Sequence, residues 1–203
     1  MTITYHDLMH AARAALRAAG VDDEANKLEA QDLICAAAGK TPEQLYRDFS
    51  LYTTDAIAET IEKYMDRRLA GEPIAYIIGE WDFMGLRFFV NPAALIPRVD
   101  TEMLAQLAIS RLKEHPGHTR VLDLCAGTGC VGLSIAATLK NTRAILVDLS
   151  DGALDLCKRN IRRHKLTGRA VYLKGGALQT PSLTLGQVGV LVCSHPLKRP
   201  GDL

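Results

Sequence analysis

The stretch Val121-Leu122-Asp123-Leu124-Cys125-Ala126-Gly127-Thr128-Gly129-Cys130-Val131-Gly132 decides the fold. An apolar run ends in a turn of small residues, and a helical pattern follows at once, so the sequence predicts a strand, a tight loop and a helix N-terminus. Glycines let the backbone approach a ligand closely, and the first turn of a helix offers unpaired N–H groups to polar atoms. We expect this loop to hold a ligand; the alternative is a tight strand-to-helix turn with no ligand.

Downstream of the loop, predicted strands alternate with predicted helices. The strands lie at 120–125, 143–148, 170–174 and 188–193, and the helices at 129–140 and 150–166, after a further helix at about 100–114. The interior strands are continuous apolar runs, as in a parallel sheet covered by helices on both faces. Right-handed crossovers then give a doubly wound α/β sheet, with the ligand at the carboxyl ends of the strands.

Upstream, residues from about 4 to 70 predict helices only. Candidate N-caps are Thr4, then Asp22 or Asp23, then Thr53 or Thr54, and Thr41-Pro42-Glu43-Gln44 places a Thr cap, a Pro at the first helical position and a Gln three residues after the cap. These segments predict a small helical bundle.

The pattern changes at Gly71. Two short runs of β type, 71–79 and 86–90, are joined through 81–85, which predicts a β-hairpin between two domains. We therefore expect a helical bundle at 1–71, a hairpin linker at 72–98 and a Rossmann-like domain at 99–203.

The composition is that of an ordinary globular protein: 203 residues, 48% hydrophobic, 23% charged, with a net charge of +1. Residues 1–60 carry 5 Lys/Arg against 10 Asp/Glu, whereas residues 151–203 carry 9 against 3. The basic residues of the C-terminal part are read mainly as one solvated helix face, so we do not expect nucleic acid as a partner.

No run reaches the roughly 20 apolar residues that a membrane span needs, and the N-terminus does not resemble a signal peptide. The five cysteines show no CxxC spacing. An odd, scattered number fits a reducing compartment, so we expect a cytoplasmic protein with no metal site.

The loop matches Gly-x-Gly-x-x-Gly at residues 127–132, and Asp148 ends the next strand, where an acid accepts hydrogen bonds from ribose hydroxyls. Two ligands fit this pattern. A dinucleotide is one, although only 71 residues follow Gly132, too few for the second half of such a fold. The other is S-adenosyl-methionine, because Asp123 and Asp148 also suit the site of class I methyltransferases.

Three further motifs carry a resemblance to a family. They are Gly71-Glu72-Pro73-Ile74-Ala75-Tyr76-Ile77-Ile78-Gly79, then Phe83-x-Gly85-Leu86, then Leu95-Ile96-Pro97-Arg98-Val99-Asp100-Thr101-Glu102. With the order of bundle, hairpin and Rossmann-like domain, the chain resembles the release factor glutamine methyltransferases (PrmC, or HemK) from about residue 5 to about residue 174. Arg98 and Glu102 are expected to pair across one helical turn.

The resemblance implies a truncated class I methyltransferase domain that uses S-adenosyl-methionine to methylate the glutamine side-chain nitrogen in the Gly-Gly-Gln loop of a peptide chain release factor. It also implies that the bundle helps to hold this partner. The implied cofactor-binding residues are Cys125, Ala126, Gly127, Thr128, Gly129, Asp148 and Ser194.

The chain departs from the family where the chemistry should occur. Gly176 stands where the family has an acid that helps hold the adenine, and Ser194-His195-Pro196-Leu197 stands where the family has Asn-Pro-Pro-Tyr. Because that motif aims the substrate nitrogen at the methyl group, we expect impaired catalysis and name no catalytic residue. His195 is read as a surface loop residue, not as a base.

The family's sheet has seven strands, and four are predicted up to Leu203, so Val190–Cys193 is expected to form an apolar edge that favours self-association. A non-catalytic module that binds a release factor or another protein is the alternative function. A nucleic-acid adenine methyltransferase, whose relatives use a similar Pro-Pro-Tyr loop, is disfavoured by the acidic N-terminal part.

Overall fold

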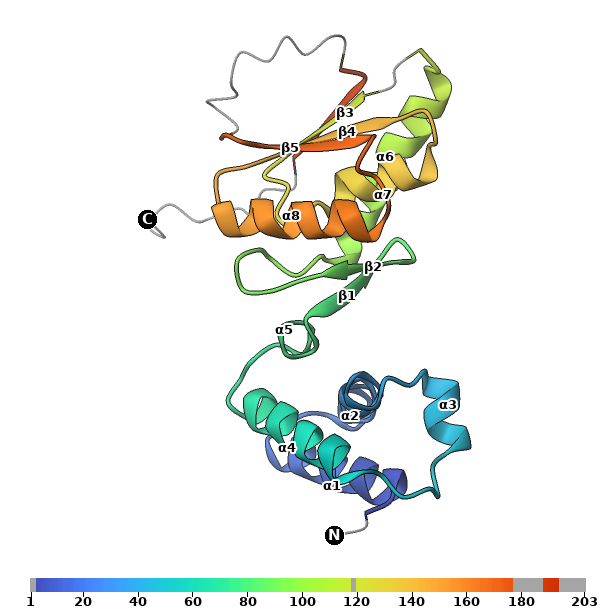
Figure 1. Cartoon of the computed structure of the whole chain (residues 1–203), viewed down its shortest axis with the longest axis vertical. Coiled ribbons are helices and arrows are strands. Elements are labelled where there is room, and N and C mark those ends of the chain that lie inside the picture. The colour runs from blue at the N-terminus through green and yellow to red at the C-terminus, as the bar shows by residue number, and fades with distance from the viewer. Residues whose placement is uncertain (1–2, 118–119, 177–187, 194–203) are drawn as a thin grey trace. The chain divides into compact units, whose positions relative to one another are not determined.

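The computed structural model describes residues 3–117, 120–176 and 188–193, and it divides into two compact units, Met1–Ile78 and Gly79–Leu203 (Figure 1). The first unit is helical, and the second combines a two-stranded hairpin, a parallel sheet and helices. Each unit has a hydrophobic core of its own. The hairpin belongs to the second unit.

Helices make up the described part of the first unit. They are α1 (Tyr5–Ala18), α2 (Asp23–Ala38), α3 (Pro42–Arg47), α4 (Asp55–Leu69) and α5 (Ile74–Ile78). Their shared core consists of Tyr5, Leu8, Met9, Ala12, Leu16, Ala30, Leu33, Ile34, Leu45, Ile61, Met65 and Ile77.

Side-chain caps start these helices, as the sequence predicts. Oγ1 of Thr4 accepts the N–H of Asp7 at 3.1 Å, and Oδ2 of Asp7 accepts the N–H of Thr4 at 3.2 Å. Thr41 and Gln44 make the same reciprocal pair at the start of α3. Each such cap satisfies N–H groups that the helix leaves unpaired, which stabilises the helix by about 1 kcal/mol.

The segment before the hairpin corrects the sequence prediction, because residues 74–78 form α5 and not a strand. Pro73 provides the carbonyl that accepts the N–H groups of Tyr76 and Ile77. At the other end, the Arg67 guanidinium donates to the carbonyls of Tyr76 and Ile77, each at 3.3 Å. The β-branched composition predicted a strand, but a cap from α4 and burial of Ile77 in the bundle core favour the helix.

A hairpin forms, but its first strand lies mostly in the segment 81–85 that was predicted to be the connection: β1 (Glu80–Phe83) pairs antiparallel with β2 (Leu86–Phe89). Met84 and Gly85 both have positive φ, +53° and +71°, as a two-residue hairpin turn requires. Phe83 and Phe88 are buried and pack edge to face in the core of the second unit.

The sheet confirms the predicted order of strands and helices. Its strands are β3 (Arg120–Leu124), β4 (Arg143–Asp148), β5 (Ala170–Lys174) and β6 (Val190–Cys193), with α6 (Val99–Glu114), α7 (Cys130–Thr138) and α8 (Asp151–Arg163). The spatial order is β5-β4-β3-β6, and every neighbouring pair is parallel. Strand order therefore reverses at β3, beside the glycine loop.

The helices α6, α7 and α8 pack on one face of this sheet, where the sequence predicted helices on both (Figure 1). Val121, Ala144 and Leu146 point into the core that these helices share. The alternate residues Leu122 and Val147 form a separate cluster on the other face.

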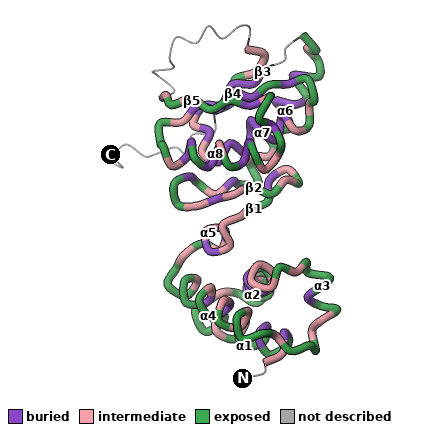
Figure 2. The backbone as a smooth tube through the Cα atoms, in the orientation of Figure 1, coloured by how far each residue is buried: buried purple, intermediate pink, exposed green. Residues whose placement is uncertain are grey.

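Burial is densest on α7, where every residue from Cys130 to Ala136 is buried (Figure 2). This helix lies against β3, β4 and α6, which explains why its sequence is apolar all round. No helix of the described part is long and apolar enough to span a bilayer.

Candidate functional site

The loop between β3 and α7 has an unusual backbone path. The φ angle is +57° at Cys125, +56° at Gly127 and +78° at Gly129, which is the N-cap of α7. Glycine adopts this left-handed region freely, whereas a side chain there costs roughly 1–2 kcal/mol. Cys125 carries this cost, and the two glycines avoid it.

The three glycines of the motif have different roles. A Cβ at Gly132 would lie 2.6 Å from Leu146 Cδ2, and one at Gly129 would lie 2.9 Å from Leu146 Cδ1. These two positions therefore let α7 pack closely on β4. At Gly127 the nearest atom would be Ala94 Cβ at 3.6 Å, an ordinary van der Waals contact, so of the three only this glycine is required by its positive φ and not by close packing.

Asp148, at the carboxyl end of β4, is bonded to the loop. Its Oδ2 accepts the N–H of Gly127 at 2.9 Å, and its Oδ1 accepts the N–H of Ser150 at 2.9 Å. A carboxylate has about four acceptor positions, so each oxygen retains one for a ligand hydroxyl. The half-buried side chain therefore positions the loop and remains able to bind a polar ligand.

Asp123, on the neighbouring strand β3, is fully buried. Its Oδ2 accepts the N–H of Gly132 at 2.8 Å, and its Oδ1 has no hydrogen-bond partner in the described part of the chain. Burial raises the pKa of this carboxyl to about 7. It lies beneath the loop and does not line the cavity described below.

Asn160 is a residue of this region that the sequence analysis did not identify. Its Nδ2 donates to the carbonyl of Thr128 at 2.9 Å and to that of Phe89 at 3.1 Å, and its Oδ1 accepts the N–H of Phe89 at 2.8 Å. This fully buried amide thus joins α8 to both the loop and the hairpin. The sequence could have indicated Asn160, because it is a polar residue one turn after Leu156 on the apolar face of the predicted helix.

A cavity of about 990 Å³ opens beside the loop. Four of the predicted loop residues, Cys125 to Thr128, line it together with Asp148, whereas Gly129 does not. Further lining residues that the sequence analysis did not single out for this role include Ala94, Ile96, Leu104, Leu149, Ser150 and Ala153. The walls thus combine apolar side chains with the carboxylates of Asp100 and Asp148, the guanidinium of Arg98 and backbone polar groups.

The segment before α6 contributes another wall of the cavity. The prediction that Arg98 pairs with Glu102 is wrong. Arg98 lines the cavity, and no ion pair joins it to Glu102 within the residues that the structure describes. Arg98 is the N-cap of α6 with an extended backbone, so the spacing of a helical turn does not apply. Glu102 instead accepts the N–H of Met84 at 2.7 Å and holds the hairpin turn.

Of the two predicted departures from the family, the structure describes Gly176 but not residues 194–197. Gly176 is buried, and a Cβ there would lie 3.4 Å from Leu149 Cδ1. Ser194, His195, Pro196 and Leu197 lie outside the described residues.

Cys193, the last residue of β6, pairs in register with Leu124 and so lies beside the start of the loop. Burial is the main cause that raises the pKa of the Cys125 thiol to about 11, so this thiol is neutral at pH 7.

Comparison with known families gives two matches. Residues 7–79 match the PrmC N-terminal domain, and residues 97–198 match the methyltransferase small domain, which covers half of the chain.

Similar proteins include the release factor glutamine methyltransferase of Nitratidesulfovibrio vulgaris, 35% identical over 95% of this chain and 64% of the relative. The protein of the same name from Clostridium botulinum is 38% identical over 70% of this chain and 50% of the relative. A solved human structure, methyltransferase 10 domain containing protein, has a TM-score of 0.47 and 20% identity over 57% of this chain and 56% of its own. The chain spans between half and about two thirds of the length of these curated relatives.

Proposed function

We propose that this chain, which belongs to the methyltransferase small domain family, binds S-adenosyl-methionine in the cavity beside the β3–α7 loop. The observation that carries the proposal is the carboxylate of Asp148, held by the N–H of Gly127 at the carboxyl end of β4. Asp148 lies next to the carboxyl end of β3, where the strand order reverses and where open parallel sheets bind their ligands.

The residues present suit this ligand. A cavity of about 990 Å³ is at the upper end of the range for small-molecule sites. Asp148 would accept hydrogen bonds from the two ribose hydroxyls, and the exposed side chain of Leu149 would cover a face of the adenine ring. Gly127 lines this cavity without a side chain, which allows the methionine end to approach the backbone.

S-adenosyl-methionine supplies an electrophilic methyl group on a positively charged sulfur. In our proposal, Cys125 to Thr128, with Asp148 and Ser194, hold the donor, Gly129 shapes the loop, and the chain's remaining task is to aim the acceptor nitrogen. An amide nitrogen is a weak nucleophile, so its orientation decides the rate.

The proposed acceptor is the glutamine side-chain nitrogen of a peptide chain release factor. One support is that the relatives at 35–38% identity are release factor glutamine methyltransferases. The other is the match of residues 7–79 to the PrmC N-terminal domain, which we propose helps to hold the release factor. Release factors act in the cytoplasm, and we propose that this protein does too.

Ser194-His195-Pro196-Leu197 makes impaired methyl transfer part of the proposal. A serine is shorter than the asparagine that it replaces, and Leu197 has neither the ring nor the hydroxyl of tyrosine. A misplacement of 1 Å costs roughly 10²-fold in rate. This observation favours a second candidate function, a module that binds a release factor without methylating it.

Self-association through β6 is a further proposal about partners. Among the described strands β6 pairs only with β3, and Leu191 is 57% exposed. A concentration-dependent sedimentation coefficient would support pairing between copies, and a constant monomer value would contradict it.

Calorimetry with S-adenosyl-homocysteine and NADH in parallel tests the cofactor. We expect only the first to bind. Asp148→Asn should weaken its binding roughly ten- to hundredfold, because a hydrogen bond to a charged group contributes about 1.5–3 kcal/mol. Asp155→Asn, the same change on the exposed face of α8, is the matched control and should leave binding unchanged.

Binding of NADH alone would replace this proposal with a dinucleotide enzyme. Binding of neither compound would show that the pocket of this chain does not hold a cofactor.

A further inference from the structure

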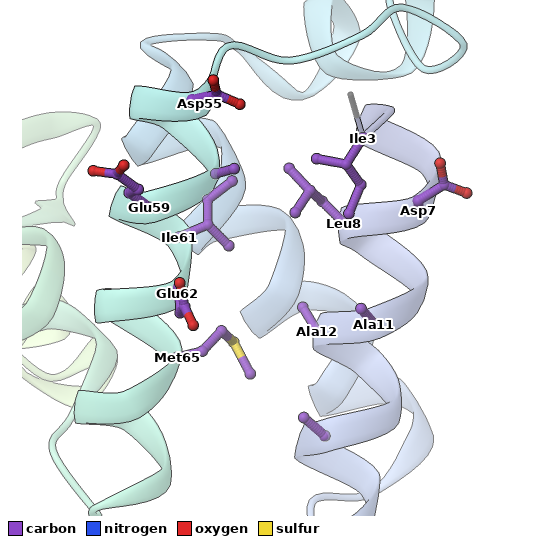
Figure 3. Close-up of a pocket in the computed structure, with 12 residues that line it drawn as sticks. Ile3, Asp7, Leu8, Ala11, Ala12, Asp55, Glu59, Ile61, Glu62 and Met65 are labelled. Carbon is purple, nitrogen blue, oxygen red and sulfur yellow. The ribbon is translucent and has the colours of Figure 1, made fainter. Parts of the chain in front are cut away.

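A groove of about 950 Å³ lies between α1 and α4 in the helical unit (Figure 3). Its floor is formed by Leu8, Ile61 and Met65, which are buried and belong to the core of the bundle. Figure 3 shows the side chains of Ile3, Leu8, Ile61 and Met65 pointing into the space between the two helices. The groove is thus an extension of the bundle core that opens to solvent.

Small residues explain why the groove is open. Ala11, Ala12 and Ala15 line it from α1, and Ala58 lines it from α4. Helices pack when the side chains of one fill the grooves of the other, and a methyl group cannot fill the space between two helix axes. The α1–α4 contact therefore leaves room for a third element.

The margins of the groove are acidic. Asp7, Asp55, Glu59 and Glu62 line it, and none of its twelve described lining residues is Lys or Arg. No ion pair involves Glu59 or Glu62 in the described part of the chain. Hydrogen bonds from Thr4 hold the pKa of Asp7 below its usual value. The margins therefore carry acidic side chains with no basic side chain among the described lining residues.

We propose that the groove between α1 and α4 binds one basic amphipathic helix of a protein partner. The occupant's apolar side chains fill the space above Leu8, Ile61 and Met65, and its Lys or Arg side chains pair with the carboxylates at the margins. The inference concerns a surface other than the proposed cofactor site, and it stands whether or not this chain transfers methyl groups.

The shape of the groove selects a helix. Two helices form its walls, and an amphipathic helix laid between them completes a bundle in which each apolar stripe is buried. The lining runs from Asp55 to Met65 along α4, roughly 15 Å at 1.5 Å per residue. That length accommodates about three turns, enough for anchors at i, i+4 and i+7.

The probe is a labelled peptide of about 14 residues with leucine anchors at this spacing and lysines on both flanks, with a length of about 21 Å as a helix. Fluorescence anisotropy with the full chain should detect binding that weakens at least tenfold from about 50 mM to about 500 mM salt, since salt screens charges at the surface. A peptide with glutamate in place of lysine should bind at least tenfold more weakly.

Two variants locate the site. Glu59→Gln with Glu62→Gln should weaken binding of the basic peptide at least tenfold and reduce its salt dependence. The control is Glu24→Gln with Asp66→Asn, which changes the net charge equally at exposed positions outside the groove and should have no effect. Ala11→Trp, at an exposed position on α1, should fill the groove and abolish binding, with the circular dichroism spectrum unchanged.

Three results would overturn the proposal. One is equal binding of the basic and acidic peptides, and another is an equal loss of affinity in the test and control double variants. The third is absence of peptide binding together with a dimer that Ala11→Trp dissociates, since a second copy of this chain would then occupy the groove.

Discussion

Asp123 and Asp148 stand on neighbouring parallel strands, yet their surroundings give them different roles. Asp148 is half-buried and accepts two backbone N–H groups, one of them from the glycine loop. Asp123 is fully buried with a single backbone donor, the N–H of Gly132. A buried carboxyl with one donor favours its neutral form, so Asp123 is a structural residue and Asp148 is the candidate for ligand binding.

At the residue scale, Asp123 predicts a pH dependence. Its pKa is raised to about 7 in the folded chain, against about 3.9 in an unfolded one. Between these values the folded state binds more protons than the unfolded state, so this group's contribution to stability is present below about pH 4 and is lost as pH rises to about 7. Urea unfolding from pH 5.5 to 7.5 should show this loss.

Asp123→Asn is the control for this titration, because its amide oxygen can still accept the N–H of Gly132. The unfolding free energy of the variant should lack the decrease that Asp123 causes as pH rises. The difference in unfolding free energy between Asp123→Asn and the unchanged protein should therefore vary with pH. His164, whose pKa is lowered by burial, contributes in the opposite direction in both proteins. A pH-independent difference would refute the assignment to Asp123.

At the scale of elements, the second unit depends on contacts between segments far apart in the chain. Asn160 on α8 bonds to Phe89 on β2 and to Thr128 in the loop. Arg163, also on α8, forms an ion pair with Glu80 on β1 at 2.6 Å. The hairpin is therefore held against α8 by one buried amide and one half-buried ion pair, in addition to the packing of Phe83 and Phe88.

Asn160→Ala should destabilise the chain by about 2–4 kcal/mol, because three hydrogen bonds are lost and buried backbone groups of Phe89 and Thr128 remain unpaired. Thermal or urea unfolding gives the value. Arg162→Ala, on the exposed face of the same helix, should change stability by less than about 0.5 kcal/mol. Equal effects of the two substitutions would contradict the anchoring role of Asn160.

At the scale of the whole molecule, two units with separate cores carry the two proposed tasks. The helical unit carries the acidic groove, and the second unit carries the cavity beside the β3–α7 loop. A relative that matches 95% of this chain is a release factor glutamine methyltransferase, and this chain spans 64% of its length. We therefore propose that binding of the partner and transfer of the methyl group are separable functions.

Incubation with a release factor and labelled S-adenosyl-methionine separates the two candidate functions. We expect the chain to bind the release factor in a pull-down assay and to transfer methyl groups at least 10²-fold more slowly than a relative that has Asn-Pro-Pro-Tyr, since that motif aims the acceptor. Transfer at the rate of such a relative would show that residues 194–197 aim the acceptor as well as Asn-Pro-Pro-Tyr does. Absence of release-factor binding would contradict both candidates.

The sequence by itself determined features whose hydrogen bonds close within a few residues. Thr4, Thr41 and Thr54 cap their helices as predicted, because each accepts an N–H three residues ahead. The glycine loop forms at the residues where the sequence predicted it, because the positive φ at Gly127 and Gly129 depends on the residue type itself. The alternation of strands and helices also followed from local periodicity, whereas the position of β6 beside β3 is a pairing between distant segments that the structure shows.

Only the tertiary structure decided features that depend on segments far apart in the chain. Ile74 to Ile78 form a helix because Arg67 caps it, Glu102 bonds to Met84 and not to Arg98, and Asn160 holds a hairpin about 70 residues before it. The groove between α1 and α4 likewise depends on which alanines face each other across two helices. Hydrophobic periodicity predicts which face of each helix or strand is buried. Which element packs against that face depends on how the whole chain folds.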